Sequence, residues 1–214
     1  MMNVHKASVP LNNIVWAETS FPPINLYSAP KLKENKMKLI GIAGLARSGK
    51  DTAGKYLAKS LGLETYALAS PIKKIVNDMF GWDERHSDGE LKEIGDPVWG
   101  FSPRKAYQLF GTEFGRALRD DMWTKMAENK AKELGGLIVT DVRFENEASW
   151  IRSSGGIVIH VHRDSIKNKV RAHASEAGLV HAPTDWTVWN NESIEQFYSM
   201  LDDTIEDIRE YYND

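Results

Sequence analysis

The chain has 214 residues, 42% of them hydrophobic, which suits one globular domain with a core of its own and a lid or tail attached. Its formal net charge of −3 and isoelectric point near 6.1 argue against a protein that coats nucleic acid, because such proteins present a basic face. The lack of cysteine excludes disulfides and thiolate metal sites, and no apolar run approaches the roughly 20 residues that span a bilayer. We expect a soluble cytoplasmic protein with no nucleic-acid or membrane partner.

Residues 1–36 differ in character from the rest of the chain. Four prolines are scattered among polar residues, and no hydrophobic period holds across the segment. Such a sequence does not specify a packed element. We therefore predict an irregular N-terminal extension over 1–36, followed by one domain over 37–214.

From residue 37 onward, apolar strands alternate with amphipathic helices. Apolar runs predict strands, at 38–43, 64–69, 136–141, 156–162 and 185–191. Apolar residues at helical spacing predict helices, at 53–61, 70–80, 102–110, 121–134 and 193–212. Strands that are apolar on both faces and are separated by helices indicate a parallel sheet covered on both sides. The expected fold class is therefore a doubly wound α/β sandwich.

Several of these helices carry start and stop signals. Ser70 and Ser102 are expected N-caps, and each is followed by a proline. Gly62, Gly81 and Gly111 are expected to end the first three helices. The residues expected to face inward are Met122, Met126 and Leu134 in the fourth helix, and Ile194, Phe197, Leu201, Ile205, Ile208 and Tyr212 in the last.

Residues 44–50 read Gly-Leu-Ala-Arg-Ser-Gly-Lys and lie between the first strand and the first helix, which is the context that a phosphate-binding loop requires. Its glycines let successive N–H groups point into one concavity, and the start of the helix adds partial positive charge. Lys50 can then reach the β- and γ-phosphates of a nucleotide. The alternative is a glycine-rich turn with a solvated lysine. The residues expected to bind the donor nucleotide are Gly44, Arg47, Ser48, Gly49, Lys50, Asp51 and Thr52.

The position after the lysine departs from the usual phosphate loop. A serine or threonine normally stands there to hold Mg²⁺, but this chain has Asp51, followed by Thr52. Asp51 is expected either to hold the metal through water or to cap the helix. Asp141 ends the predicted strand 136–141, and such strand ends lie at the ligand crevice of parallel sheets. The candidate metal ligands are Asp51, Thr52 and Asp141.

Two further stretches supply groups for a second ligand. In the stretch 102–123, Arg104 suits bidentate phosphate recognition and Gln108 suits the edge of a base. Arg143 follows Asp141 by two residues and is expected to point to the same crevice. The alternative for Arg104 and Gln108 is a solvated face of an amphipathic helix. The alternative for the other stretch is that Asp141 caps the next helix and that Arg143 forms an ion pair with Glu145 or Glu147.

Four stretches together resemble the deoxynucleoside monophosphate kinases of bacteriophages, which are P-loop enzymes: GLARSGKDT (44–52), ASPIKK (69–74), YQLFGTEFGR (107–116) and TDVRFENEA (140–148). The resemblance covers about residues 37–212, and the Gly-Lys-Asp-Thr variant of the loop belongs to that family. It implies a P-loop NTPase fold of the nucleoside monophosphate kinase type, and transfer of the γ-phosphate of ATP, with Mg²⁺, to a deoxynucleoside monophosphate. Members of the family are often dimers, so a homodimer is compatible with it. The acceptor site that it implies is lined by Ile72, Lys73, Arg104, Gln108, Gly111, Thr112, Glu113, Arg116, Arg143 and Glu147.

The stretch 163–184 is rich in cations. In kinases of this class, the corresponding position is a helical lid that closes over the phosphates and excludes water. Arg163 and Arg171 are expected to join Lys50 and Arg143 in neutralising charge on the transferred phosphoryl group. The alternative for this stretch is a solvated helix.

Other interpretations are open at this point. Trp82 and Trp99 flank a polar insertion and either stack on a base or serve as core or cover. A dephospho-coenzyme A kinase shares the loop chemistry but phosphorylates another acceptor. A non-catalytic module binds ATP without turnover.

Overall fold

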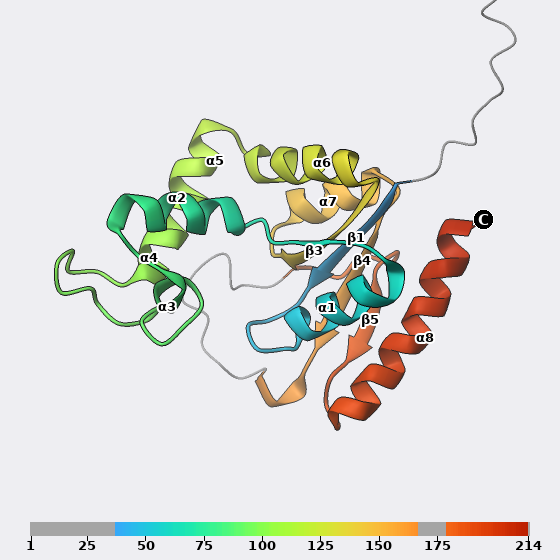
Figure 1. The fold of residues 1–214 in the computed structure, drawn as a ribbon. Coiled ribbons are helices and arrows are strands. Elements are labelled where there is room, and N and C mark those ends of the chain that lie inside the picture. The colour runs from blue at the N-terminus through green and yellow to red at the C-terminus, as the bar shows by residue number, and fades with distance from the viewer. Residues whose placement is uncertain (1–36, 167–178, 214) are drawn as a thin grey trace, which may run out of the picture. The chain divides into compact units, whose positions relative to one another are not determined.

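The computed structural model describes residues 37–166 and 179–213 (Figure 1). The irregular extension expected over 1–36 therefore lies outside the described residues, as does the central part of the expected lid, which contains Arg171.

The described residues contain a sheet of five parallel strands in the order β2-β3-β1-β4-β5. The strands are β1 (Lys38–Ala43), β2 (Thr65–Tyr66), β3 (Gly136–Val142), β4 (Ile157–His162) and β5 (Trp186–Trp189). Because β1 and β3 are neighbours, the loop that follows Ala43 opens beside Asp141 and Arg143. Residues from distant parts of the chain thus meet at the carboxyl edge of the sheet, where ligands bind in folds of this kind.

Helices cover both faces of the sheet, as Figure 1 shows. One face carries α1 (Lys50–Leu61) and α8 (Ile194–Asn213), and the other carries α6 (Met122–Leu134) and α7 (Glu145–Ser153). The doubly wound α/β fold is therefore confirmed. Between β2 and α6 lies a helical insert formed by α2 (Ser70–Phe80), α3 (Glu84–Ser87), α4 (Pro103–Gln108), the π-helix η1 (Leu109–Phe114) and α5 (Gly115–Leu118). A short 3-10 helix, η2 (Asp164–Ile166), follows β4.

Alternation along the strands divides the core into two clusters, one on each face. In β1, Leu39 belongs to the cluster shared with α6 and α7, and Ile40 to the cluster shared with α1 and α8. In β3, Leu137 and Ile138 divide in the same way. All four side chains are fully buried, and burying one contributes about 1.5–3 kcal/mol relative to leaving it exposed. Hydrophobic packing on both faces therefore holds the strands that position the site.

Most of the predicted helix boundaries are confirmed. Gly62 and Gly81 follow the last residues of α1 and α2 in the left-handed conformation, with φ of 67° and 70°. Ser102 caps α4, because its hydroxyl accepts the N–H of Lys105 at 3.4 Å. The prediction for Ser70 is wrong: Ala69 is the N-cap of α2 and already has helical backbone angles.

Gly111 does not end a helix, contrary to the prediction. The helical run continues from α4 through η1 and α5 to Leu118. Gly111 is buried within it, and a Cβ at this position would lie 2.9 Å from Cδ1 of Ile72. Its carbonyl accepts the indole N–H of Trp123 at 2.8 Å. The glycine therefore permits close packing against α2, which is a long-range requirement that the local sequence does not reveal.

The strand β2 is shorter than predicted. The apolar run 64–69 forms a strand only over Thr65–Tyr66. The N–H groups of Leu68 and Ala69 donate to the carboxylate of Asp141, at 2.6 and 3.0 Å, in place of sheet partners. The side chain of Asp141 in β3 thus takes the N–H groups that would have continued β2.

Two predicted inward-facing residues are instead exposed. Met126 in α6 is 40% exposed and Ile194 in α8 is 45% exposed. The buried face of α6 includes Trp123, Ala127 and Ala131. The small alanines let this face approach the sheet, and Ile194 stands at the first position of α8, ahead of the buried series that begins at Phe197.

Candidate active site

The loop between β1 and α1 curls into a cradle. Gly44, Arg47 and Gly49 have φ of 145°, 68° and 107°, in the region that favours glycine. A Cβ on Gly44 would lie 2.5 Å from the carbonyl oxygen of Val161, so a side chain there would collide with β4. Arg47 is held in a conformation that costs a non-glycine residue about 1–3 kcal/mol, and such strain is typical of ligand-binding loops.

Lys50 and Ser48 are two buried polar residues of this cradle. Lys50 is 9% exposed, and its ammonium group donates to the carbonyl of Leu45 at 2.8 Å. Burial, and next the charge of Arg143, lower the pKa of Lys50 below that of an exposed lysine. The hydroxyl of Ser48 is buried without a hydrogen-bond partner among the described residues. An unpaired buried hydroxyl costs about 1–3 kcal/mol, which a phosphate oxygen bound in the cradle would recover.

Asn190, which the sequence analysis missed, holds the loop by a hydrogen bond from the segment that follows β5. Its side-chain amide donates to the carbonyl of Ser48 at 2.8 Å, and its backbone N–H donates to the carbonyl of His162 at 2.8 Å. The predicted strand and turn over 185–191 contained this residue but gave no sign of its partners. Asn190 therefore ties the loop to the end of β4.

A cavity of about 390 Å³ opens at the start of α1. It brings together Lys50, Asp51, Thr52 and Arg163, all of them predicted site residues, and Asn190 and Glu192 also line it. Asp51 is exposed and Thr52 is partly buried. Mg²⁺ is usually held by one or two carboxylates together with substrate phosphates, so a single aspartate and a hydroxyl beside the phosphate cradle fit such an ion.

Asp141 lies at the end of β3 with both carboxylate oxygens engaged by backbone N–H groups of Leu68 and Ala69. Burial raises the pKa of Asp141, and these two hydrogen bonds and the charge of Arg143 counteract part of that effect. Asp141 does not cap the next helix, since the N-cap of α7 is Phe144. It fixes the junction between β2 and α2.

A second cavity, of about 110 Å³, lies between the helical insert and the end of β3. Nine of the ten residues predicted for the acceptor site line it: Ile72, Lys73, Arg104, Gln108, Gly111, Thr112, Arg116, Arg143 and Glu147. The tenth, Glu113, is exposed and stands outside this lining. Asp141, predicted as a metal ligand, also lines this cavity, and the sequence analysis missed six further lining residues, which are Leu68, Ala69, Lys92, Tyr107, Trp123 and Phe144.

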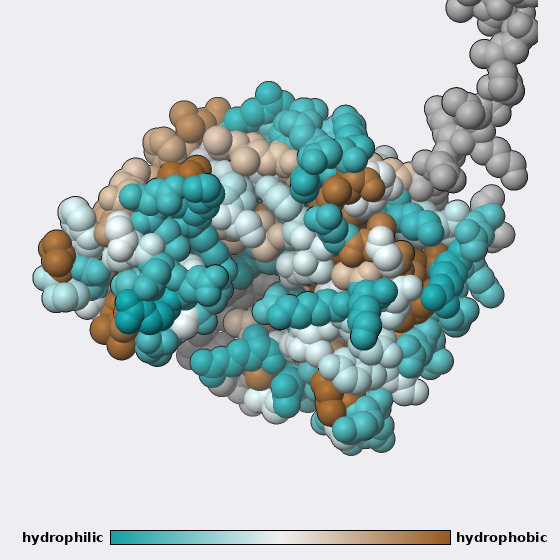
Figure 2. All heavy atoms as spheres, viewed as in Figure 1, coloured by the Kyte–Doolittle hydropathy of each residue, from teal (hydrophilic) through white to brown (hydrophobic). Residues whose placement is uncertain are grey.

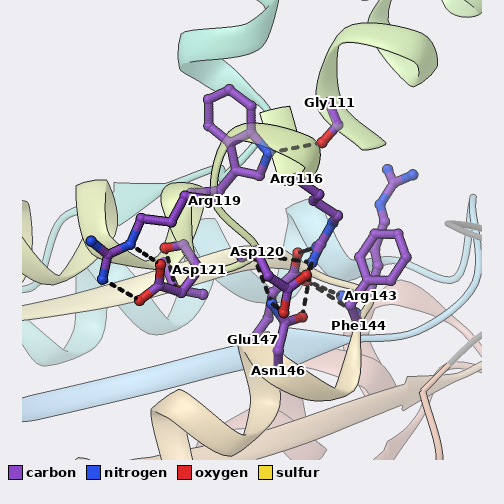
Figure 3. Close-up of polar contacts among 11 residues, drawn as sticks. Gly111, Arg116, Arg119, Asp120, Asp121, Arg143, Phe144, Asn146 and Glu147 are labelled. Carbon is purple, nitrogen blue, oxygen red and sulfur yellow. Dashed lines mark hydrogen bonds and ion pairs between the residues drawn. The ribbon is translucent and has the colours of Figure 1, made fainter. Parts of the chain in front are cut away.

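A network of polar contacts forms the floor of this second cavity (Figure 3). A guanidinium nitrogen of Arg116 donates to Glu147 at 2.7 Å, and the guanidinium lies 3.9 Å from the ring centre of Phe144. The other carboxylate oxygen of Glu147 accepts the backbone N–H groups of Arg143 and Phe144, at 2.8 and 3.1 Å. Arg143 thus contacts Glu147 through its backbone, and its guanidinium makes no hydrogen bond or ion pair with the described residues, although its charge acts on Asp141 and Lys50.

The ion pair of Arg116 and Glu147 therefore fixes the backbone of Arg143 and Phe144 in the cavity wall. Glu147 is 4% exposed, and burial raises its pKa above that of an exposed glutamate. Arg116 supplies the compensating charge, because an unpaired carboxylate in such a place is strongly unfavourable. Together they hold Arg143 at the mouth of the cavity.

Trp82 and Trp99 cover the helical insert. Trp82 is 8% exposed, donates to Asp96 at 2.8 Å and packs on Phe80 with ring centres 4.7 Å apart. The ring of Trp99 meets the same Phe80 edge-on at 5.1 Å. These contacts place both tryptophans in an aromatic cluster, in which Trp82 is buried and Trp99, 46% exposed, forms the cover.

Comparisons with known proteins identify a family for this chain. The sequence matches the family described as deoxynucleotide monophosphate kinase over residues 38–94 and 90–201. A protein of Acanthamoeba polyphaga mimivirus, described as a candidate deoxynucleotide monophosphate kinase, is 33% identical over 183 residues, covering 77% of this chain and 94% of that protein. The deoxynucleotide monophosphate kinase of Escherichia phage RB69 is 25% identical over 243 residues, covering 78% of this chain and 98% of that protein.

Among solved structures, a dephospho-CoA kinase from Campylobacter jejuni aligns with a TM-score of 0.43 and 13% identity, covering 79% of this chain and 96% of that one. Within the described part of the chain, no helix is both long and apolar enough to cross a membrane. The family match and the mimivirus relative show that the chain belongs to the deoxynucleotide monophosphate kinase family.

Proposed function

We propose that the protein transfers the γ-phosphate of ATP to a deoxynucleoside monophosphate, giving the diphosphate and ADP. One observation carries this proposal beyond family membership. The acceptor cavity and a cavity of about 240 Å³ beside the phosphate loop share a wall, so two ligands bound in them would meet. The shared residues are Ala69, Lys73, Lys92, Arg104, Asp141 and Arg143. Figure 2 shows this face of the molecule hollowed between the helical insert and α1.

On the donor side, the loop would bind the phosphates of ATP. The ammonium of Lys50 would exchange its bond to the carbonyl of Leu45 for a phosphate oxygen. Asp51 and Thr52 would hold Mg²⁺, directly or through water, and the bound ion would neutralise charge on the β- and γ-phosphates. Arg163 lines the cavity at the start of α1 together with Asp51 and Thr52, and it would add a further cation.

On the acceptor side, the nucleophile is an oxygen of the acceptor's own phosphate. It is already ionised near neutral pH, so the protein needs no strong general base. This oxygen bonds to the γ-phosphorus while the bond from that phosphorus to the β,γ-bridging oxygen breaks, and ADP leaves. Arg143 and Arg104 would hold the acceptor phosphate in line, which is the main catalytic task in such reactions.

We also propose a kinase domain over 37–214 with a lid over about 163–184, for which the described ends of the lid give support. Arg163 and η2 follow β4 directly. At the other end, Leu179 lines the cavity beside the loop, and the ring of His181 lies 4.6 Å from that of His160 in β4. Both ends thus begin at the site that a lid would cover.

The decisive experiment supplies the purified protein with Mg-ATP and one acceptor at a time. The acceptors are dAMP, dCMP, dGMP, dTMP, AMP, GMP and dephospho-coenzyme A, and the products are ADP and the phosphorylated acceptor. We expect turnover on one or more deoxynucleotides. Turnover on dephospho-coenzyme A alone would move the function to that rival, and ATP binding without any product would favour a non-catalytic module.

A further inference from the structure

Lys92 stands in the wall shared by the two cavities, yet neither the motifs nor the proposed chemistry gives it a role. Lys73, Lys92, Arg104 and Arg143 together place four cations in this wall. The other three lie in stretches that the sequence analysis singled out, Lys73 and Arg104 on predicted helices and Arg143 after a predicted strand. Lys92 comes from the connection between α3 and α4, which in sequence is only a polar insertion.

The structure holds Lys92 in this wall by fixed contacts. The carbonyl of Lys92 accepts the backbone N–H of Arg104 at 3.0 Å, and the side chain of Arg104 contacts Glu93 at 2.5 Å. Further along, the carboxylate of Asp96 accepts the indole N–H of Trp82. The insertion is thus tied to the start of α4 and to the aromatic cluster, and the Lys92 side chain is only 28% exposed.

The charges around Lys92 indicate a place for an anion. Burial, followed by the charge of Lys73, lowers the pKa of Lys92, and Arg104 and Arg143 act in the same direction. One carboxylate oxygen of Asp88 lies 2.5 Å from the ammonium of Lys73 and 3.8 Å from that of Lys92. A single negative oxygen therefore sits between two ammonium groups in a crowded cationic wall.

We propose that Lys92 binds the phosphate of the acceptor, and that Asp88 occupies this phosphate's place while no acceptor is bound. The inference rests on the proposed function and identifies the acceptor group as a phosphate monoester dianion. The side chain of Asp88 is 64% exposed, so it can turn into solvent without opening the core. A phosphate dianion offers more charge and more oxygens than one carboxylate, so it displaces Asp88 from between Lys73 and Lys92.

The test compares Lys92→Met with a matched control, Lys105→Met, since Lys105 is exposed on α4 and lines neither cavity. Calorimetry measures binding of the preferred deoxynucleoside monophosphate without ATP, and steady-state assays give KM for each substrate. Losing one charge-assisted hydrogen bond should weaken acceptor binding by roughly 10- to 100-fold. The KM for ATP should change less than about twofold, and Lys105→Met should match the wild type.

Unchanged acceptor binding in Lys92→Met, with the wild type turning over deoxynucleotides, would overturn this inference and leave the proposed function standing. A wild type that turns over no deoxynucleotide would overturn the function itself. Lys92→Arg serves as the second variant if Lys92→Met melts at a lower temperature, and it should retain most of the binding because it keeps the charge.

The role of Asp88 has its own test. Asp88→Asn removes the competing charge, so acceptor binding should tighten by several-fold. Weaker binding in this variant would show instead that Asp88 holds the two lysines in position, and would overturn its role as a stand-in for phosphate.

Discussion

At the residue scale, the proposed phosphate chemistry depends on a few donor groups whose surroundings leave them available. Ser48 is a buried hydroxyl without a hydrogen-bond partner among the described residues. Within the same part of the chain, the only side-chain hydrogen bond of Lys50 goes to a carbonyl of its own loop, and the guanidinium of Arg143 makes no hydrogen bond or ion pair. Such donors are already in place before the substrate arrives. Preorganised donors need no rearrangement during the reaction, which is why they stabilise the transition state.

Lys50→Ala tests the most central of these donors. We expect kcat to fall at least about 100-fold, because removal of one preorganised donor typically has this effect. Steady-state kinetics with Mg-ATP and the preferred acceptor give the measurement. Lys55→Ala, an exposed position on the same helix, is the control and should leave kcat unchanged. A kcat for Lys50→Ala within a few-fold of the wild type would remove Lys50 from the proposed mechanism.

At the element scale, the site is shaped by how closely its helices and strands approach one another. Gly111 brings η1 against α2, and Asp141 fixes the junction between β2 and α2. Both contacts set the width of the acceptor cavity. A change in either is therefore expected to affect acceptor binding before it affects the donor loop.

Gly111→Ala tests the close approach. The added Cβ would meet the δ1 methyl group of Ile72 at 2.9 Å, and such overpacking costs about 1–3 kcal/mol of stability, less where that methyl group can turn aside. The preference of a helix interior for Ala over Gly offsets about 0.5–1 kcal/mol of this cost. We expect a lower melting temperature and a raised KM for the acceptor, with KM for ATP unchanged. Gly95→Ala is the control, since a Cβ there meets nothing within 4 Å. Equal acceptor KM in both variants would show that η1 has room to move.

Asp185 joins three elements at the start of β5. Its carboxylate accepts two hydrogen bonds from Arg152 in α7, at 2.8 and 2.7 Å, and lies 2.9 Å from a ring nitrogen of His160 in β4. Burial alone would raise the pKa of Asp185, but the hydrogen bonds from Arg152, Ala182 and His160 outweigh burial and lower it to about 2. The ionised carboxylate is thus a structural tie between the sheet and α7.

Asp185→Asn should lower the free energy of unfolding by about 3 kcal/mol near pH 7, as loss of one partner from a buried ion pair does. Because the pKa is lower in the folded state, the wild type has the full contribution above about pH 5 and loses it as the pH falls toward 2. Denaturant unfolding at several pH values should show the gap between wild type and variant closing over that range. Asp203→Asn, at an exposed position in α8, should show no gap at any pH.

At the scale of the whole molecule, the shared wall between the two cavities is the central feature. A bisubstrate analogue, in which adenosine and a deoxynucleoside are joined through an oligophosphate chain, should reach both cavities at once. Binding of its second half is then intramolecular, so we expect its Kd to be at least about 100-fold below that of either nucleotide. Inhibition competitive with both substrates is the measurement. Competition with ATP alone would mean that the cavities do not act as one site.

The sequence by itself determined the features that depend on local pattern. Apolar runs and capping residues predicted the alternation of strands and helices, because burial on both faces and helix capping act over a few residues. The glycine spacing around Lys50 predicted the phosphate loop, since those φ angles are set within the loop itself. The family stretches contain most of the residues that line the second cavity, including Arg143 and Gln108.

Only the tertiary structure decided which polar side chains meet. Glu113 and Arg116 lie three residues apart, yet one is exposed and the other forms the cavity floor, because a π-helical segment sets the faces of this run. Lys92 and Asn190 reach the site from connections that carry no motif. Their positions follow from hydrogen bonds and packing between segments far apart in the chain, and a single sequence without its fold contains no local signal for such contacts.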